Sequence, residues 1–331
     1  FTNALRMFRV NKYLYCNALK FFSSTLKHFI KICISYIFYI SGIFKLILKF
    51  KGYPVLTYHN IIQDKYFDNK LHLGVSHSNS VFEKQLNVLS KYVGKENLHL
   101  TFDDGYKNNL ENAVPILEKF GLVGEFFVPL HKKSTDQPFW IDKIMFFFSY
   151  IENGNYSLVA KNFKLTDNNR GDMFSFFFDA INKDYSLKNI ITDEVSHYLK
   201  TFNVKINQEY WDSRFSFLDK DDYDTMMKNN HKLGFHMVNH DICSHLTMYD
   251  IEKELDDVKI LLERYNITSF SFPFGGKTEV NLNMINLLKE RGFTFIYSNT
   301  NLNLHKDIKS RVSIPNIKNK YLIISSYMNF F

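Results

Sequence analysis

The chain has 331 residues, enough for one large domain or two small ones, and 45% of them are hydrophobic, which predicts a sizeable core. The net charge of +7 is uneven: residues 1–52 hold nine Lys or Arg and no acidic residue, whereas the rest holds 32 basic and 34 acidic residues. This balance argues against nucleic acid as a partner of the main body, and three scattered cysteines predict no disulfide framework.

The first predicted element is a basic, apolar arm over residues 1–52. Its uncharged stretch from Ile32 to Phe44 is shorter than the ~20 residues of a membrane-spanning helix. If the stretch extends to Leu48 and the Lys45 amine reaches the membrane interface, a membrane-spanning helix remains possible. A helix lying on the surface of an anionic bilayer fits equally well. A helix packed on the outside of the next domain is the third interpretation. We expect the arm to contact membrane lipid.

From Tyr53 onward, short apolar runs alternate with amphipathic stretches, which is typical of repeated strand–helix units. Strands are predicted at residues 53–58, 99–102, 123–128, 269–273 and 293–297. Helices are predicted at residues 81–92, 108–120, 221–230, 248–265 and 281–291. Thr247 and Asp250 have the spacing of a capping box at the start of the fourth helix.

The regular pattern lapses between about residues 131 and 215, which indicates an insertion into a main unit that covers residues 53–331. Trp140 lies near the start of this insertion. Its ring could stack on a sugar, or it could anchor the insertion to the main unit.

Two adjacent carboxylates, Asp103 and Asp104, follow the predicted strand 99–102 and precede Gly105. At the end of a strand they can line a cavity, where both are costly to ionise without a cation or a shared proton. Asp and Gly are also ordinary turn residues, so this segment alone is equally compatible with a simple turn.

A histidine pair, His236 and His240, lies far downstream in the sequence. At this spacing both imidazoles share one face of a helix or of a tight helical turn, and both can reach one metal ion. Two histidines and one carboxylate with an open fourth position are typical of catalytic zinc. His240 and His245 form the rival pair.

Residues 101–105 read Thr-Phe-Asp-Asp-Gly and, with the later histidine pair, resemble the motifs of the polysaccharide deacetylase family, the NodB-like carbohydrate esterases. Met237 stands where the second motif of that family has Ser or Thr. The resemblance covers most of residues 53–317 and is loose in the insertion. It implies an α/β fold, a distorted (β/α) barrel of the polysaccharide deacetylase type, here with an N-terminal helical arm.

The resemblance also implies roles for single residues. Asp104, His236 and His240 would bind a divalent metal, for which we expect Zn²⁺, and Asp103 would be the general base. A backbone N–H near Phe274 would stabilise the oxyanion.

Two parts of the family pattern are missing. Ser271 stands where many members have an arginine that orients the base, which leaves open how Asp103 is held. No residue matches the late histidine that serves as general acid; His59, His245 and His305 are the candidates.

The predicted function is metal-dependent removal of an N-acetyl group from an amino sugar of a bacterial envelope polysaccharide or lipid-linked glycan. The acetylated glycan and membrane lipid are the expected partners, and we expect a membrane-associated protein. Two alternatives remain: a cyclic-amide hydrolase on the same barrel, and a membrane-attached glycan-binding protein whose site has decayed.

Overall fold

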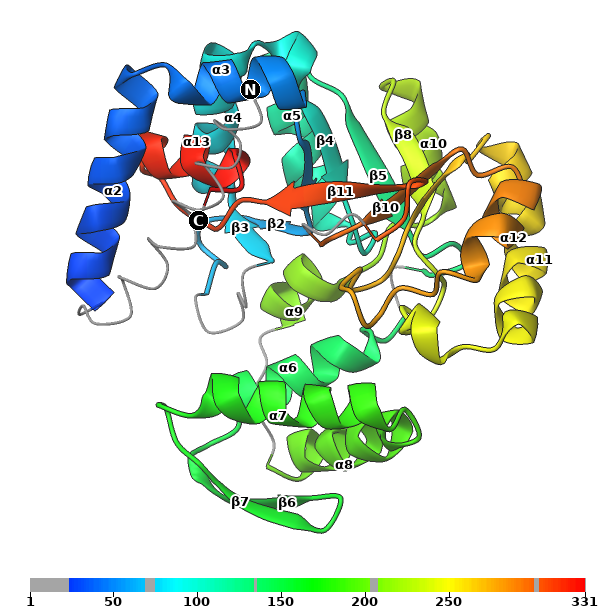
Figure 1. The fold of residues 1–331 in the computed structure, drawn as a ribbon. Helices are drawn as coiled ribbons and strands as arrows, with labels where there is room; N and C mark the ends of the chain where they lie inside the picture. Colours follow the sequence, from blue (N-terminus) through cyan, green and yellow to red (C-terminus); the bar gives the residue numbers. More distant parts are fainter. Residues whose placement is uncertain (1–23, 69–74, 134–135, 203–207, 301–303, 331) are drawn as a thin grey trace.

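The computed structural model describes residues 24–68, 75–133, 136–202, 208–300 and 304–330. Seven parallel strands close into a barrel in the order β1-β11-β10-β9-β8-β5-β4. Helices cover the outside of this barrel (Figure 1), so the predicted α/β barrel fold is confirmed. The barrel strands are β1 (Val55–Tyr58), β4 (His99–Phe102), β5 (Gly124–Val128), β8 (Lys232–Phe235), β9 (Ser269–Ser271), β10 (Phe295–Ser298) and β11 (Ile308–Ser313).

Two of these strands were not predicted from the sequence. β8 is only four residues long and ends directly before the histidine pair, and β11 is polar at most positions. β11 nevertheless closes the barrel, because it pairs with β1 on one side and β10 on the other. A short polar strand lacks the apolar run by which the other strands are recognised.

The helices that cover the barrel follow the strands in sequence. The capping box of α11 forms as predicted, with the side chains of Thr247 and Asp250 each bonded to the backbone of the other residue. The helix expected at 108–120 starts as a π-helical turn, in which the Val114 N–H donates to the Asn109 carbonyl oxygen, and Pro115 follows in the first turn of α5. The covering helices are α4 (Asn79–Val93), η4 (Asn109–Ala113), α5 (Val114–Phe120), α10 (Lys220–Lys228), α11 (Met248–Arg264), α12 (Met284–Glu290) and α13 (Lys320–Tyr327).

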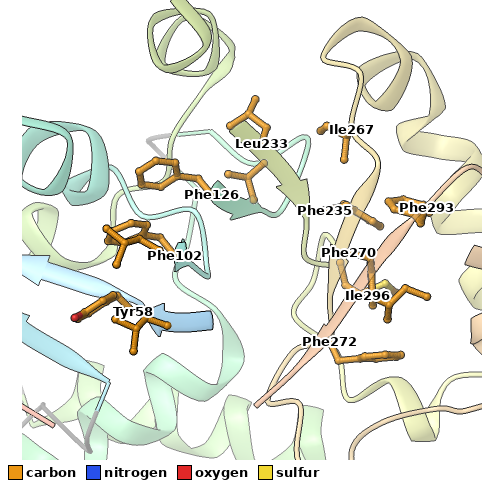
Figure 2. Packing of buried hydrophobic residues seen from close by; sticks show 14 of the residues in the cluster. Tyr58, Phe102, Phe126, Leu233, Phe235, Ile267, Phe270, Phe272, Phe293 and Ile296 are labelled. Carbon is orange, nitrogen blue, oxygen red and sulfur yellow. The ribbon is translucent and has the colours of Figure 1, made fainter. Parts of the chain in front are cut away.

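Aromatic side chains fill the layer between strands and helices. Tyr58, Phe102 and Phe126, from three adjacent strands, lie in a row (Figure 2). The ring centroids of Phe102 lie 5.6 Å from Tyr58 and 4.6 Å from Phe126, and Phe82 of α4 meets Phe102 edge-on. Burial of such side chains stabilises each by about 1.5–3 kcal/mol, which explains why the aromatic content is high.

The segment between β5 and α10 contains regular helices and a hairpin where the sequence showed no clean period (Figure 1). It consists of α6 (Trp140–Tyr150), the antiparallel strands β6 (Gly154–Leu158) and β7 (Lys161–Leu165), α7 (Arg170–Lys183), α8 (Leu187–Thr201) and α9 (Gln208–Phe215). Phe147, Phe177 and Ile191 belong to a separate hydrophobic cluster inside it. We call this segment the insertion below, and its boundaries at 131 and 215 stay a prediction.

The described part of the arm consists of two helices, α2 (Ser24–Ile40) and α3 (Ile43–Lys51). Their inner side packs on α13: the Ser35 and Ser325 hydroxyl oxygens are 2.9 Å apart, and Phe44 is fully buried beside Ile324. Among the described residues, no single helix is long and apolar enough to cross a bilayer, but the pair, bent by 73°, could do so by length and composition. Residues 1–23 of the predicted arm lie outside the described residues.

Candidate metal centre

Three predicted ligands converge at the carboxyl ends of the barrel strands. Asp104 follows β4, His236 directly follows β8, and His240 lies on the loop beyond. One ligand atom from each lies within 4.8 Å of the other two, and all three residues are buried. Strand ends of this kind are where parallel barrels carry their functional groups.

The two histidines do not share a helical face, so that expectation is wrong. Both are in irregular backbone, and Met237 and His240 have left-handed φ angles of 53° and 54°. These angles turn the loop back on itself, so the two rings still meet, with centroids 5.1 Å apart. Asp104 and Phe274, with φ of 74° and 60°, are also left-handed, so backbone strain is concentrated at this site.

The donor atoms fit a cation. His236 Nδ1 donates to the Ser271 carbonyl oxygen at 2.8 Å, so Nε2 of the neutral ring carries a lone pair. Asp104 Oδ1 lies 3.3 Å from this nitrogen and 3.1 Å from His240 Nε2. Within the described part of the chain, Asp104 Oδ1 and His240 Nδ1 have no hydrogen-bond partner. The Asp104 oxygen therefore faces the lone pair of His236 Nε2, which is unfavourable unless a cation or a proton lies between them.

The Asp104 carboxyl is prepared for this role by its surroundings. Burial raises its pKa, but the neighbouring imidazoles, first His59 and then His236 and His240, outweigh burial, so the pKa lies well below the ordinary value. Gly105, which follows, has φ of +63°, and a Cβ there would lie 2.5 Å from Pro129 Cδ. This position of the motif therefore requires glycine.

Asp103 is held by an arginine that sequence reasoning missed. Arg311 of β11 donates from Nη1 to Oδ1 at 2.7 Å and from Nη2 to Oδ2 at 2.5 Å, and both side chains are fully buried. Arg311 Nη2 also donates to Ser271 Oγ at 2.6 Å. An arginine from another strand thus contacts Asp103, the predicted base, and Ser271 contacts the arginine.

The sequence does not link Arg311 to Asp103 because the two residues are far apart along the chain. Arg311 lies 208 residues from Asp103, and Ile308 and Val312 are the only apolar neighbours that mark its strand.

Burial raises the Asp103 pKa, but Arg311 and then His236 outweigh burial, so the pKa lies below the ordinary value. Asp103 is therefore ionised at neutral pH.

Among the three candidate general acids, the structure places His59 at the site. His59 follows β1, and its Nε2 lies 3.9 Å from Asp103 Oδ2. Burial lowers its pKa, although the charges of Asp104 and Asp103 oppose this. His245 instead stacks on Tyr185 of the insertion, and His305 pairs with Asp307.

Trp140 and Phe274, which were predicted to lie near the substrate, both contact His240, one of the three candidate metal ligands. Trp140 is only 8% exposed, and its Nε1 donates to the His240 carbonyl oxygen at 3.1 Å. The Phe274 ring meets the His240 ring edge-on at 4.7 Å, and Phe139 stacks on the same ring at 4.7 Å. Trp140 thus has the contacts of an anchor rather than of an open sugar platform.

Comparison with known proteins gives structural similarity only. No protein-family model matches the chain, and no curated protein matches it. A Streptococcus pyogenes deacetylase, PplD, in complex with acetate is similar at TM-score 0.48 and 14% identity, over 82% of this chain and 96% of that chain. IcaB from Ammonifex degensii is similar at TM-score 0.46 and 11% identity, over 83% and 98%. A de-N-acetylase from Aggregatibacter actinomycetemcomitans is similar at TM-score 0.46 and 12% identity, over 84% and 99%.

Proposed function

We propose that this protein is a metal-dependent hydrolase that removes the N-acetyl group from an amino sugar of a bacterial envelope polysaccharide or lipid-linked glycan. One observation carries the proposal: the buried Asp104, His236 and His240 face one another, and Asp103 is fixed beside them by Arg311. Two histidines and one carboxylate leave a coordination position open, as a catalytic site requires, and we expect Zn²⁺ there. A bound cation of this kind polarises a carbonyl and lowers the pKa of water.

The other residues of the site then have definite tasks. Asp103, ionised at neutral pH, takes a proton from the attacking water. His59, whose Nε2 lies 3.9 Å from Asp103 Oδ2 and must move closer to accept that proton, is assigned to pass it to the departing amine nitrogen. A backbone N–H near Phe274 is assigned to the oxyanion, because that residue lies beside His240.

Arg311 also bears on the alternative of a decayed binding protein. The apparent loss of the arginine that orients the base was one reason to consider decay. Because Arg311 holds Asp103 through two hydrogen bonds, that reason no longer applies. The donor set for a metal favours amide hydrolysis at an acetylated sugar, which is the function we retain.

The test combines metal analysis with acetate release from an acetylated chitooligosaccharide. Asp104→Asn should lose both bound zinc and acetate release, because one charged ligand is gone. Asp103→Asn is the matched control: it should keep zinc and lose acetate release. Unchanged zinc in Asp104→Asn would contradict the ligand assignment, and acetate release by Asp103→Asn at the wild-type rate would contradict the base.

We also propose that the arm places the enzyme on an anionic bilayer surface. The outer sides of α2 and α3 expose large apolar side chains, among them Phe29 (61%), Ile37 (53%) and Ile40 (60%). The two helices contain five lysines and no acidic residue, which suits anionic lipid. Their inner sides are already covered by the barrel, so surface binding leaves that contact intact.

Sedimentation with vesicles tests this proposal. The wild-type protein should pellet with phosphatidylglycerol vesicles and less with phosphatidylcholine vesicles. The double substitution of Phe29 and Ile37 by Ser should reduce pelleting. Ile260→Ser, at a 79% exposed apolar position on α11, is the control and should not. Equal pelleting of the double variant and wild type would overturn the proposed face.

A further inference from the structure

The third metal ligand is held by the insertion, whereas the barrel holds the other two. Asp104 is the second residue after β4. His236 is fixed by the hydrogen bond from its Nδ1 to the Ser271 carbonyl oxygen in β9. The loop of His240 instead contacts the insertion on several sides. Its carbonyl oxygen accepts from Trp140 Nε1 at the start of α6.

The residues after His240 are tied more tightly still. Asp241 Oδ1 accepts from the Tyr185 hydroxyl and from Lys188 Nζ of α8, both at 2.5 Å. The Ile242 N–H donates to the same Tyr185 hydroxyl at 3.1 Å, and the Ile242 side chain belongs to the hydrophobic cluster of the insertion. The Tyr185 ring also stacks on His245 at 4.8 Å.

Lys188 carries the positive charge that balances Asp241, so it is the most important residue of this contact. Asp241 is 8% exposed, and Glu254 of α11 lies close enough for the two carboxylates to interact unfavourably. Glu254 also accepts from the Val238 N–H within the loop between the two histidines. Without the lysine, the buried Asp241 carboxylate would keep its bond from the Tyr185 hydroxyl but would have no positive charge beside it to balance a second carboxylate, and the loop would have to move to hydrate it.

The backbone of His240 needs this support. Its left-handed φ of 54° is costly for a residue other than glycine, and such a conformation persists only where surrounding contacts fix it. Phe274 and Glu254 contact the loop from the barrel side, and Trp140, Tyr185 and Lys188 of the insertion hold the backbone at His240 and Asp241.

We infer that Lys188 and Tyr185, acting through Asp241, are positioning residues for the ligand His240, so that the insertion sets the metal affinity of the barrel site. This inference rests on the proposed metal centre. Groups that orient a metal ligand typically change metal affinity 10–100-fold when they are removed.

Cobalt binding to the full chain tests the inference without any substrate. Lys188→Met should weaken Co²⁺ binding about tenfold or more in a competition titration, and should change the visible absorption of the bound Co²⁺ because His240 is displaced. Lys188→Arg keeps the charge and should restore much of the affinity. Lys200→Met, at an exposed lysine of the same helix, is the matched control and should bind Co²⁺ like wild type.

The outcomes separate this inference from the proposed function. If wild type binds no Co²⁺ or Zn²⁺, the metal centre itself is wrong. If wild type and Lys188→Met bind Co²⁺ with equal affinity and identical spectra, the metal centre stands and the positioning role is overturned. Circular dichroism of each metal-free variant checks that a loss of affinity is not a loss of fold.

Discussion

At the scale of single residues, the adjacent carboxylates Asp103 and Asp104 have opposite surroundings. Asp103 is fully buried against the Arg311 guanidinium, whereas Asp104 faces two imidazoles. Successive residues at a strand end point in different directions, so the side chain that faces the barrel interior and the one that faces the loops meet different partners. In the function proposed above, this separation would let one of them bind a cation and the other move a proton.

Arg311→Met should move the acid limb of the kcat/KM profile to higher pH. Without the guanidinium, burial raises the Asp103 pKa, so the base is protonated at pH values where the wild-type base is ionised. Loss of a neighbouring positive charge is worth roughly 1–3 pH units. Arg311→Lys keeps the charge and should shift the limb less. An unchanged limb in Arg311→Met, with zinc content equal to wild type, would show that Arg311 does not act on Asp103.

Asp142 makes a second prediction at this scale, about stability in the metal-free protein. Its carboxylate accepts from the Tyr106 hydroxyl at 2.8 Å and from the Phe139 N–H at 3.2 Å. Burial, followed by the charge of Asp104, raises its pKa from 3.8 to about 7. Between pH 3.8 and about pH 7, the folded protein keeps the Asp142 proton, whereas the unfolded chain releases it. Stability therefore falls as pH rises through this window, by about 4 kcal/mol in total.

Asp142→Asn cannot ionise and should lack this fall. Urea unfolding with a chelator should show the variant gaining stability relative to wild type between pH 5 and pH 8. Asp193→Asn, at an exposed position of α8, is the control and should follow wild type. If Asp142→Asn loses as much stability over this range as wild type, Asp142 is not the group responsible.

At the scale of elements, close strand packing shapes the barrel next to the site. Gly234 of β8 lies between Phe127 of β5 and Ser269 of β9, and a Cβ there would be 2.4 Å from Phe127 Cδ1 and 2.9 Å from Ser269 Oγ. His236 leaves the barrel two residues later. A displacement of β8 would therefore move a metal ligand.

Gly234→Ala should lower the free energy of unfolding by about 1–3 kcal/mol, because the added methyl overpacks the contact with Phe127. Urea denaturation measures this change. Gly171→Ala in α7 is the control, since a Cβ there meets nothing within 4 Å, and it should leave stability unchanged or raise it slightly. Equal midpoints for Gly234→Ala and wild type would mean that β8 shifts at little cost.

At the scale of the whole molecule, the candidate metal centre joins parts that are far apart in the sequence. Asp104 and His236 come from two barrel strands, and His240 is fixed by the insertion. This arrangement exists only in the folded chain, so a bound cation stabilises the fold as a whole.

Zinc should therefore raise the thermal unfolding temperature, and a chelator should lower it. At a free zinc concentration one hundred times the dissociation constant, the stabilisation is about 2.7 kcal/mol. Scanning calorimetry of wild type and Asp104→Asn measures the difference. The variant should show no zinc-dependent shift; a shift equal to that of wild type would place the stabilising zinc elsewhere.

The sequence by itself determined the barrel class and most of its strands and helices, and it singled out the three candidate metal ligands. Apolar runs and amphipathic stripes are local patterns, and the Asp-Asp-Gly and histidine segments are short enough to be recognised as motifs. The strand at 99–102 and the capping box of α11 follow directly from such patterns.

Only the tertiary structure decided how these residues act together. It brought Arg311 across the barrel to Asp103, chose His59 over His245 and His305 as the histidine beside the base, and placed the His240 loop against the insertion. Each of these is a contact between segments distant in sequence, with no periodic signal at either end. Their physical origin is barrel closure, because β11 must lie between β1 and β10 before an arginine on it can meet the carboxylate that follows β4.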